Sequence, residues 1–316
     1  MFVFKPGLTT VDSLSLEFPS LIQDQIEQLS PPSGCQIQCR QRKLWVSPTT
    51  GRRKLTASTE VGTAWIKWCL HYPPLQAICL DSQLGEMGLK QWADWSQSAG
   101  KPCFLRLPNL SHIPQKQKPW QWRCKRILDW IVAAAILIFI SPLILVLTVF
   151  ILIDSPGPIF FKQWRVGYRG QLFQILKFRT MSVDAEQLHH QVMGNQPGLH
   201  KHQADPRVTA LGRWLRKYSL DELPQLINVL RGEMSLVGPR PWALYDALRM
   251  SNLTQKRLNA LPGITGSWQV EDRSNLLDLE TVNQGDLEYL QDWSLQRDLT
   301  ILWRTVPKVI SGSGAY

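Results

Sequence analysis

A long apolar segment without charges is the feature that most constrains this chain. No charged residue lies between Asp129 and Asp154, and residues 130–153 are almost all aliphatic or aromatic. As a helix with a rise of about 1.5 Å per residue, these residues would extend about 36 Å, which is sufficient to cross a hydrocarbon core of roughly 30 Å. Helices of soluble proteins are seldom so long and so uniformly apolar. The segment therefore predicts insertion into a membrane.

Two features of this segment predict a hairpin rather than a straight span. Ser141-Pro142 lies at its centre, and proline removes a backbone donor and clashes with the preceding turn. Both ends carry basic flanks, which favour the cytoplasmic side. The flanking residues are Lys116, Lys118, Arg123, Lys125 and Arg126 before the segment, and Lys162, Arg165 and Arg169 after it. A helix that breaks at Ser141-Pro142 and returns to the same side satisfies both flanks, and the Ser141 hydroxyl can bond a freed carbonyl. The alternative is a kinked helix that spans the membrane.

Charge and composition indicate an anionic partner near this segment. The 316 residues carry a formal net charge of +10, with 44% hydrophobic and 19% charged side chains, a composition that excludes disorder over most of the chain. Residues 101–154 carry a net +5 and residues 155–250 a net +6. This positive charge surrounds the apolar segment, and no helix-turn-helix or zinc-finger pattern is evident. We therefore expect anionic membrane lipid or a phosphorylated substrate as the partner, and no nucleic acid.

The apolar segment separates two soluble parts. Residues 1–118 are predicted to form a small α/β module that ends in a linker, and residues 119–154 hold the basic flank and the membrane helix. The module's expected elements are strands over 36–46, 77–80 and 103–107 and helices over 62–71 and 85–98. No Gly-rich phosphate loop or catalytic constellation is present there. Its expected role is regulatory or oligomerising, which leaves a homodimer open.

Residues 155–316 contain an ordered set of motifs. Ser155-Pro156-Gly157-Pro158 ends the apolar helix. The motifs that follow are Arg165-Val166-Gly167, Leu176-Lys177-Phe178-Arg179-Thr180-Met181, Asp205-Pro206-Arg207-Val208-Thr209, Ser219-Leu220-Asp221-Glu222-Leu223-Pro224-Gln225, Val237-Gly238-Pro239-Arg240-Pro241 and Gly263-Ile264-Thr265-Gly266-Ser267-Trp268-Gln269. From about Lys125 to Thr305 the chain resembles the bacterial sugar transferase family, the monotopic polyprenyl-phosphate phosphoglycosyl transferases.

The resemblance implies an architecture and a location. It implies an α+β chain in which a re-entrant membrane helix, broken at Ser141-Pro142, precedes a mainly helical cytosolic catalytic domain over 155–316. Both soluble parts would lie on the cytoplasmic side of the bacterial cytoplasmic (inner) membrane. With its soluble N-terminal module, the chain also resembles cyanobacterial members linked to envelope polysaccharide synthesis.

The resemblance further implies a reaction. Members transfer a sugar 1-phosphate from a nucleotide sugar, usually a UDP-sugar, to polyprenyl (undecaprenyl) phosphate and release the nucleoside monophosphate, here UMP, which initiates exopolysaccharide or another lipid-linked glycan. The catalytic Asp-Glu pair of the family maps onto Asp221 and Glu222. A carboxylate can attack phosphorus and form a covalent phosphosugar, and a second carboxylate can hold Mg²⁺. We therefore expect Asp221 to be the nucleophile and Glu222 to hold the metal.

A purely structural interpretation of this dipeptide competes with the catalytic one. Ser219-x-x-Glu222 has the pattern of a capping box, and Asp221 before Pro224 is a reasonable N-cap residue. The two interpretations are compatible, because a helix N-terminus also favours negative charge and phosphate.

Basic residues near the carboxylates are candidate ligands for the diphosphate. Arginine grips phosphate oxygens with two parallel hydrogen bonds, and charge neutralisation contributes much of phosphoryl-transfer catalysis. Lys177, Arg179 and Arg240 are the first choices, and Arg213 and Arg216 are secondary ones. Arg240 stands between two prolines, which restricts its backbone. A catalytically inactive membrane-anchored scaffold for polysaccharide assembly is the alternative function, and the presence of the Asp-Glu pair argues against it.

Overall fold

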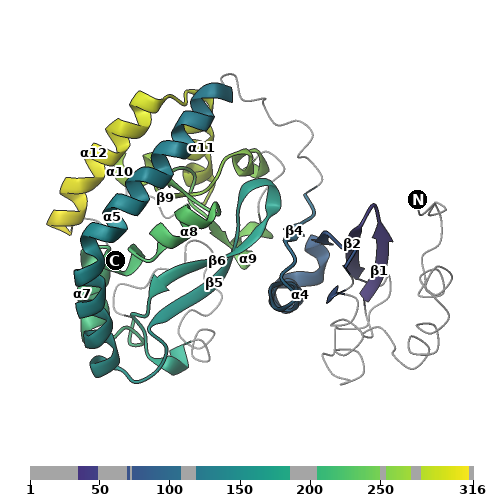
Figure 1. The fold of residues 1–316 in the computed structure, drawn as a ribbon, viewed down its shortest axis with the longest axis horizontal. Helices are drawn as coiled ribbons and strands as arrows, with labels where there is room; N and C mark the ends of the chain where they lie inside the picture. The colour runs from purple at the N-terminus through teal and green to yellow at the C-terminus, as the bar shows by residue number, and fades with distance from the viewer. Residues whose placement is uncertain are drawn as a thin grey trace. The chain divides into compact units, whose positions relative to one another are not determined.

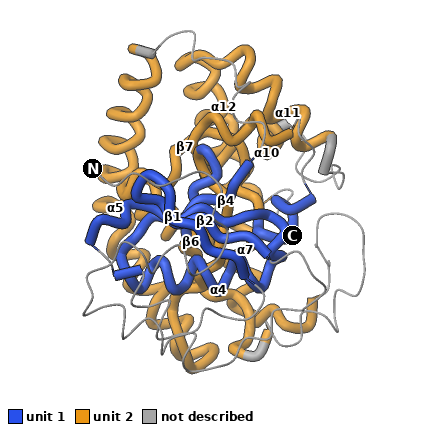
Figure 2. The backbone as a smooth tube through the Cα atoms, turned by 90° about the vertical axis from the view of Figure 1, so that its right-hand side faces the viewer, with its two compact units in different colours: residues 1–108, 169–173, 243–250 blue, residues 109–168, 174–242, 251–316 orange. Residues whose placement is uncertain are grey.

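The computed structural model describes residues 35–48, 70–71, 73–107, 119–185, 205–249, 254–271 and 279–312. The chain divides into two compact units (Figure 2). Unit 1 consists of residues 1–108, 169–173 and 243–250, and unit 2 contains the remaining residues. Most of the helix predicted over 62–71 lies outside the described residues.

Unit 1 contains a four-stranded sheet in the order β1-β2-β3-β4. The first pair is antiparallel and the other two pairs are parallel. The strands are β1 Cys35–Arg40, β2 Lys43–Pro48, β3 Ala77–Leu80 and β4 Cys103–Leu105, and α4 spans Gly85–Ser98. β3 and α4 have the predicted bounds. The single strand predicted over 36–46 was wrong, because Gln41 and Arg42 have φ values of 51° and 61° and turn the chain into a hairpin.

Unit 2 combines helices with most of two small sheets (Figure 1). A three-stranded sheet has the order β6-β5-β8, and a parallel pair joins β7 to β9. The strands are β5 Phe160–Val166, β6 Leu172–Phe178, β7 Ser235–Val237, β8 Trp242–Ala243 and β9 Gly263–Thr265. The helices that matter for the site are α5 Pro119–Asp154, α7 Ala210–Lys217, the 3₁₀ turn η5 Leu220–Glu222, α8 Gln225–Arg231, α10 Ser267–Glu271, α11 Leu279–Gln291 and α12 Leu295–Ser311.

The apolar segment, residues 130–153, forms about the last two-thirds of α5. Within the described residues, Trp120–Asp154 is the one helix long and apolar enough to cross a membrane, and only 11% of its most apolar window is buried. The helix assignment continues through the predicted break, with Pro142 inside it. The Ser141 hydroxyl donates a hydrogen bond to the carbonyl of Ile138 (2.8 Å). Figure 1 shows that the helix changes direction between its two halves.

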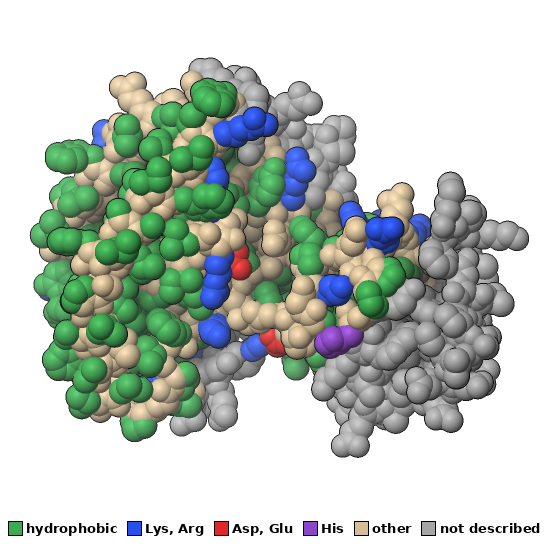
Figure 3. Space-filling view, viewed as in Figure 1, with side chains coloured by type: hydrophobic (Ala, Val, Ile, Leu, Met, Phe, Trp, Pro, Cys, Tyr) green, Lys and Arg blue, Asp and Glu red, His purple; other side chains and the backbone are tan. Residues whose placement is uncertain are grey.

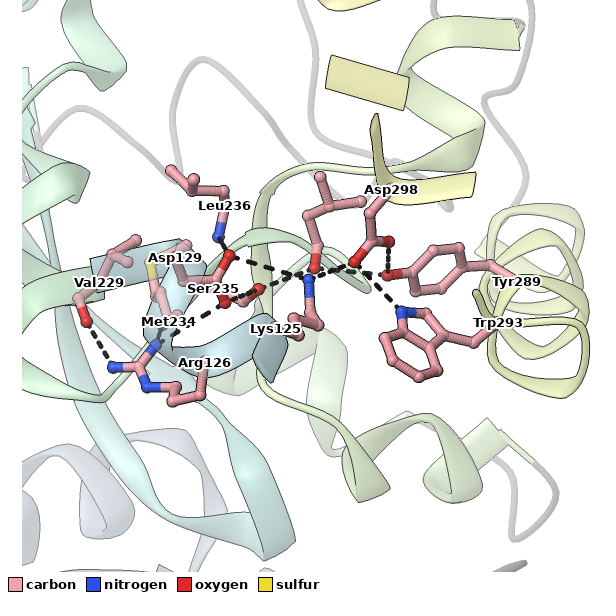
Figure 4. A network of polar contacts seen from close by, with 11 residues as sticks. Lys125, Arg126, Asp129, Val229, Met234, Ser235, Leu236, Tyr289, Trp293 and Asp298 are labelled. Carbon is pink, nitrogen blue, oxygen red and sulfur yellow. Dashed lines mark hydrogen bonds and ion pairs between the residues drawn. The ribbon is translucent and has the colours of Figure 1, made fainter. Parts of the chain in front are cut away.

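A buried polar network fixes the first half of α5 to unit 2 (Figure 4). Lys125 Nζ lies 2.6 Å from Asp298 Oδ2, and both side chains are 7% exposed. Tyr289 and Trp293 also donate hydrogen bonds to the Asp298 carboxylate, at 2.6 and 3.1 Å. One turn further along α5, Asp129 accepts hydrogen bonds from the Ser235 hydroxyl (2.7 Å) and the Leu236 amide (3.3 Å).

The second half of α5 is fixed to the same unit by apolar contacts. Leu147 and Ile151 are buried in one cluster with Phe178 of β6 and Leu215 of α7. A straight helix that crossed a bilayer would carry its two ends to opposite sides. In the structure, both halves of α5 contact other elements of unit 2.

We predict that Lys125→Met strongly destabilises the chain. It leaves the Asp298 carboxylate buried without its cation, and breaking a buried pair from one side costs roughly 3–5 kcal/mol. Thermal unfolding of the detergent-solubilised chain measures the loss. Lys162→Met is the matched control, because Lys162 is exposed on β5. Equal melting temperatures for the two variants would contradict a stabilising role for the network.

Candidate active site

An open cleft in unit 2 brings together side chains from distant parts of the sequence. It encloses about 270 Å³ of empty space, part of which is open to solvent. Its lining residues come from β5, β6, η5, the start of α8, the segment after β7, β9 and α10. They are Arg165, Ile175, Lys177, Glu222, Gln225, Arg240, Pro241, Gly263, Ile264 and Gln269.

Lys177 and the adjacent carboxylates form the charged centre of this site. Lys177 Nζ donates a hydrogen bond to Glu222 Oε1 at 2.6 Å and lies 3.9 Å from Asp221 Oδ2. Glu222 lines the cleft, and Asp221 lies deeper, with only 8% of the residue exposed. The predicted dyad and Lys177 are therefore assembled around one point.

Asn228 holds the strand that carries Lys177. This fully buried residue of α8 accepts a hydrogen bond from the Leu176 amide (3.0 Å) and donates one to the Gln174 carbonyl (2.8 Å). Its side chain thus connects α8 to two backbone groups of β6, one on each side of Ile175. Because an unpaired buried amide is costly, this arrangement fixes β6 relative to the helix that follows the dyad.

The turn that carries the dyad has a constrained backbone. Ser219, directly before η5, has φ 53°, in the left-handed region that L-residues rarely occupy. Leu220 and Leu223 pack against the cluster formed by Leu147, Ile151, Phe178 and Leu215. The second half of the apolar helix therefore lies directly beneath the turn and supports it.

The capping interpretation of the dyad is wrong in its details. The Ser219 side chain makes no capping hydrogen bond to η5. The following helix, α8, begins at Gln225 with Pro224 at the N-cap position and no side-chain cap. Neither carboxylate is thus required to begin α8.

Burial changes the acidity of the nucleophile candidate. Removal from water raises the pKa of Asp221 to about 6, the nearby Glu222 charge adds to this rise, and Lys177 and Arg216 oppose it. Burial also lowers the pKa of Arg216, which the Asp221 charge counteracts. With a pKa of about 6, Asp221 is mainly ionised at neutral pH, which a carboxylate nucleophile requires.

The predicted phosphate ligands are distributed unequally. Arg240 lines the cleft, with its guanidinium 5.2 Å from the Trp268 ring centroid. Arg179 instead donates hydrogen bonds to the carbonyls of Ser155 and Pro156, where it closes the turn after α5. Its position therefore indicates a structural role.

The secondary candidates also lie away from the cleft lining. Arg213 donates to the Val208 carbonyl (3.1 Å), and Arg216 donates to the Thr180 hydroxyl (2.9 Å). Of these two, Arg216 is close enough to Asp221 to influence its charge.

Three lining residues were not singled out as ligands by the sequence. Arg165 of β5 donates a hydrogen bond to the Pro241 carbonyl (3.1 Å), beside Arg240. Gln225 and Gln269 are buried in the cleft wall. All three lie within or next to the conspicuous motifs, but only the fold shows that these motifs converge.

The carboxylates fit a magnesium ion better than a protein-enclosed metal. Within the described ranges, no group of three or more His, Cys, Asp or Glu residues could hold an ion. Mg²⁺ usually keeps several waters and binds through one or two carboxylates together with substrate phosphates. Glu222 lines a cleft that also presents Lys177 and Arg240, so its carboxylate is a candidate ligand of this kind.

Comparisons with known proteins identify relatives of the segment that builds this site. Residues 120–312 match the sequence model of the family described as bacterial sugar transferase. The chain is 44% identical over 200 residues to the UDP-glucose:undecaprenyl-phosphate glucose-1-phosphate transferase of Caulobacter vibrioides, covering 61% of this chain and 72% of that protein. It is 40% identical over 215 residues to the exopolysaccharide production protein ExoY of Sinorhizobium fredii, covering 65% and 94%.

A third relative is longer than this chain. The galactosyl transferase CpsE of Streptococcus agalactiae is 40% identical over 197 residues, which cover 60% of this chain. The chain spans only 43% of the length of that protein. Residues 120–312, which match the family model, contain nearly all of α5 and every residue that lines the cleft.

The raised pKa of Asp221 predicts how stability depends on pH. Because the folded chain binds this proton more tightly than the unfolded chain, the carboxyl favours folding below about pH 4, and this contribution is lost as the pH rises through about 6. Asp221→Asn cannot ionise, so it should be more stable than the wild type at pH 7.5, by on the order of 1–3 kcal/mol. Thermal unfolding between pH 4 and 8 should show the difference shrinking as the pH falls.

Asp205→Asn is the matched control of opposite sign. Hydrogen bonds from Arg207 lower the pKa of Asp205, so its ionised form stabilises the fold at neutral pH and this contribution is lost as the pH falls through the folded pKa. Asp205→Asn should therefore be less stable than the wild type at pH 7.5. A destabilised Asp221→Asn at that pH would refute the assigned burial effect.

Proposed function

Because the chain belongs to the bacterial sugar transferase family, we propose that it transfers a sugar 1-phosphate from a UDP-sugar to undecaprenyl phosphate and releases UMP. One observation carries the proposal: the Asp221-Glu222 pair and Lys177 meet at a cleft whose wall also contains Arg240. This combines a nucleophile, a candidate metal ligand and cations for a diphosphate. The names of the relatives, with glucose, galactose and exopolysaccharide in them, support a sugar-phosphate donor and the initiation of a lipid-linked glycan.

In the first step, a carboxylate oxygen of Asp221 attacks the phosphorus atom that bears the sugar. The new bond joins Asp221 Oδ to that phosphorus, and the bridging P–O bond of the diphosphate breaks, so the electron pair leaves with UMP. Burial of Asp221 reduces its hydration, and Lys177 keeps it near the cleft. The enzyme then holds the phosphosugar as an acyl phosphate.

In the second step, a phosphate oxygen of undecaprenyl phosphate attacks the same phosphorus. The acyl-phosphate bond breaks, the Asp221 carboxylate is regenerated, and the sugar leaves on a lipid diphosphate. Splitting the transfer in this way means that the nucleotide and the lipid need not occupy the cleft together.

The cations have distinct tasks in this mechanism. Arg240, fixed between two prolines, is placed to bind the diphosphate, and Lys177 neutralises charge at the reacting phosphorus. Glu222 would hold Mg²⁺, which when bound neutralises phosphate charge. The hydrogen bond to Glu222 and the nearby Asp221 carboxylate hold Lys177 beside the reacting groups.

The distribution of apolar side chains supports a location at the surface of the bacterial inner membrane. Figure 3 shows hydrophobic side chains gathered over the part of unit 2 that holds α5 and α12. On α12, an apolar stripe is exposed at helical spacing, formed by Leu299, Trp303, Val306 and Ile310. Trp303 is 80% exposed, which is unusual for so large an apolar side chain in a soluble protein.

A re-entrant α5 accounts for these surfaces together. Both halves of α5 contact unit 2, through Lys125 and Asp129 on one side and through Leu147 and Ile151 on the other. We therefore propose that the helix enters the bilayer and returns to the cytoplasmic side, bending near Pro142, with anionic lipid beside its basic flanks. In this arrangement the cleft stays close to the lipid head groups that the second step requires.

A scaffold without catalysis is the competing function. It would leave the charges of Lys177, Asp221 and Glu222 without a task, although burying such groups is costly. The assembly of these groups in one cleft favours an enzyme.

We predict that Asp221→Asn abolishes both UMP release and covalent labelling. The change keeps the size of the side chain but removes the attacking charge, so turnover should fall by several orders of magnitude. Mass spectrometry of the chain incubated with Mg²⁺ and a panel of UDP-sugars, without lipid, should find the phosphosugar on Asp221 of the wild type. Glu288→Gln, at an exposed carboxylate outside the cleft, is the control and should remain active. An adduct on another residue, or an active Asp221→Asn, would remove Asp221 from the mechanism.

We also predict that both soluble parts face the cytoplasm. Single cysteines at Met87 and Lys162, both exposed, should be protected from an impermeant maleimide in intact cells and react after permeabilisation, relative to the unaltered chain. Reaction at position 87 alone in intact cells would contradict the re-entrant helix. Pro142→Leu should straighten α5, favour a span and expose position 87 to the reagent.

A further inference from the structure

Beneath the cleft, Arg257 and Asp286 form an ion pair that is almost completely removed from water. Arg257 is 0% exposed and Asp286 1% exposed, and a guanidinium nitrogen of Arg257 contacts Asp286 Oδ2. Burial lowers the pKa of Arg257 to about 10 and raises that of Asp286 to about 6, with each partner opposing the shift of the other. Such a pair is expensive, because apolar residues of similar size often stabilise a core as well or better.

The pair contacts the main chain of one cleft residue. Arg257 donates a hydrogen bond to the carbonyl of Arg240 (2.6 Å). On the other side of the pair, the backbone amide of Arg240 lowers the pKa of Asp286 and so opposes the effect of burial. The bond from the guanidinium is charge-assisted and thus stronger than a bond between neutral groups.

Other buried groups orient Arg257 itself. Its second terminal nitrogen donates to Asn283 Oδ1 (2.8 Å), which also accepts a hydrogen bond from Trp242 Nε1 (3.1 Å). The guanidinium carbon lies 4.8 Å from the centroid of the Trp242 ring. The guanidinium is thus fixed by a carboxylate, an amide and an aromatic ring, and the nitrogen that contacts Asp286 also donates to the Arg240 carbonyl.

The neighbouring carbonyls are held as well. The Pro239 carbonyl accepts a hydrogen bond from the Gly263 amide (2.9 Å), and the Pro241 carbonyl accepts one from Arg165 (3.1 Å). Three successive carbonyls, at residues 239, 240 and 241, therefore each have a donor from a different element. The prolines limit rotation at two of these residues, but only the external donors fix where the segment lies.

We propose that the Arg257–Asp286 pair is a positioning device that holds the main chain of Arg240 so that its guanidinium faces the diphosphate site. This inference rests on the proposed function, because it takes substrate phosphate to be the ligand that Arg240 binds. The pair itself touches no substrate. A guanidinium whose backbone is fixed before binding loses less entropy when it closes on a phosphate, which strengthens binding.

The test is a double-mutant cycle read out by binding. The full-length chain in detergent is titrated with UDP and Mg²⁺, and the dissociation constant is measured for the wild type, Arg257→Lys, Arg240→Met and the double variant. Lysine keeps the positive charge but lacks the guanidinium, whose two terminal nitrogens contact Arg240, Asn283 and Asp286. Arg257→Lys should weaken UDP binding about tenfold or more in the wild-type background, and by less than about twofold once the Arg240 guanidinium is absent.

Arg207→Lys is the matched control for loss of a buried arginine fork. Arg207 pairs with Asp205 in the same unit and does not line the cleft. The Arg207→Lys variant should have a lower melting temperature than the wild type and a UDP affinity within about twofold of it. If Arg257→Lys does not fold, Asp286→Asn replaces it in the same cycle, because asparagine keeps the volume and loses only the charge.

The outcomes separate this inference from the function on which it rests. A wild type that binds no UDP contradicts the proposed function. If the wild type binds UDP and both Arg257→Lys and Asp286→Asn bind it with unchanged affinity, the positioning role of the pair is contradicted. Equal losses of UDP affinity with and without the Arg240 guanidinium also contradict the positioning role, because the pair would then act on the fold in general. Loss of affinity only when the Arg240 guanidinium is present supports it.

Discussion

The attachment of one apolar helix to a polar unit at both ends is the constraint on which the rest of the structure depends. The helix is long, apolar and little buried, as a membrane helix would be, yet its first half is joined to the rest of unit 2 through the Lys125–Asp298 pair and its second half through Leu147 and Ile151. The first attachment is electrostatic and the second apolar, so they respond differently to solvent. Because the second one supports the turn of the dyad, membrane insertion and the geometry of the candidate active site share one element.

The cleft shows how costly charges are kept where chemistry needs them. Asp221 is held in a place where burial raises its pKa, and Lys177 limits that rise. Asn228 fixes the strand that carries Lys177, and the Arg257–Asp286 pair holds the main chain of Arg240. For Lys177 and Arg240, a group that faces the cleft is thus placed by a second, more deeply buried polar group that does not line it.

Sequence patterns predicted the local elements well and the long-range placement of cations less well. The bounds of β3 and α4, the apolar helix and the convergence of Lys177 with Asp221 and Glu222 agree with the structure. Arg179 shares a motif with Lys177, but its side chain does not reach the cleft. It lies two residues further along the chain, where it bonds the carbonyls of Ser155 and Pro156 after α5. The hairpin of β1 and β2 was missed because two left-handed residues carry no proline or glycine signal.

The sequence by itself determined the properties that depend on neighbouring residues. Uniform hydrophobicity over residues 130–153 predicts a membrane helix, and the adjacency of Asp221 and Glu222 places two carboxylates at one turn. The tertiary structure decided which cations those carboxylates meet, how far Asp221 is removed from water, and which buried pair holds Arg240. Arg257 is 17 residues from Arg240 and 29 from Asp286, so no local pattern links them. Desolvation and hydrogen-bond geometry are properties of the packed unit, and they exist only after distant segments have met.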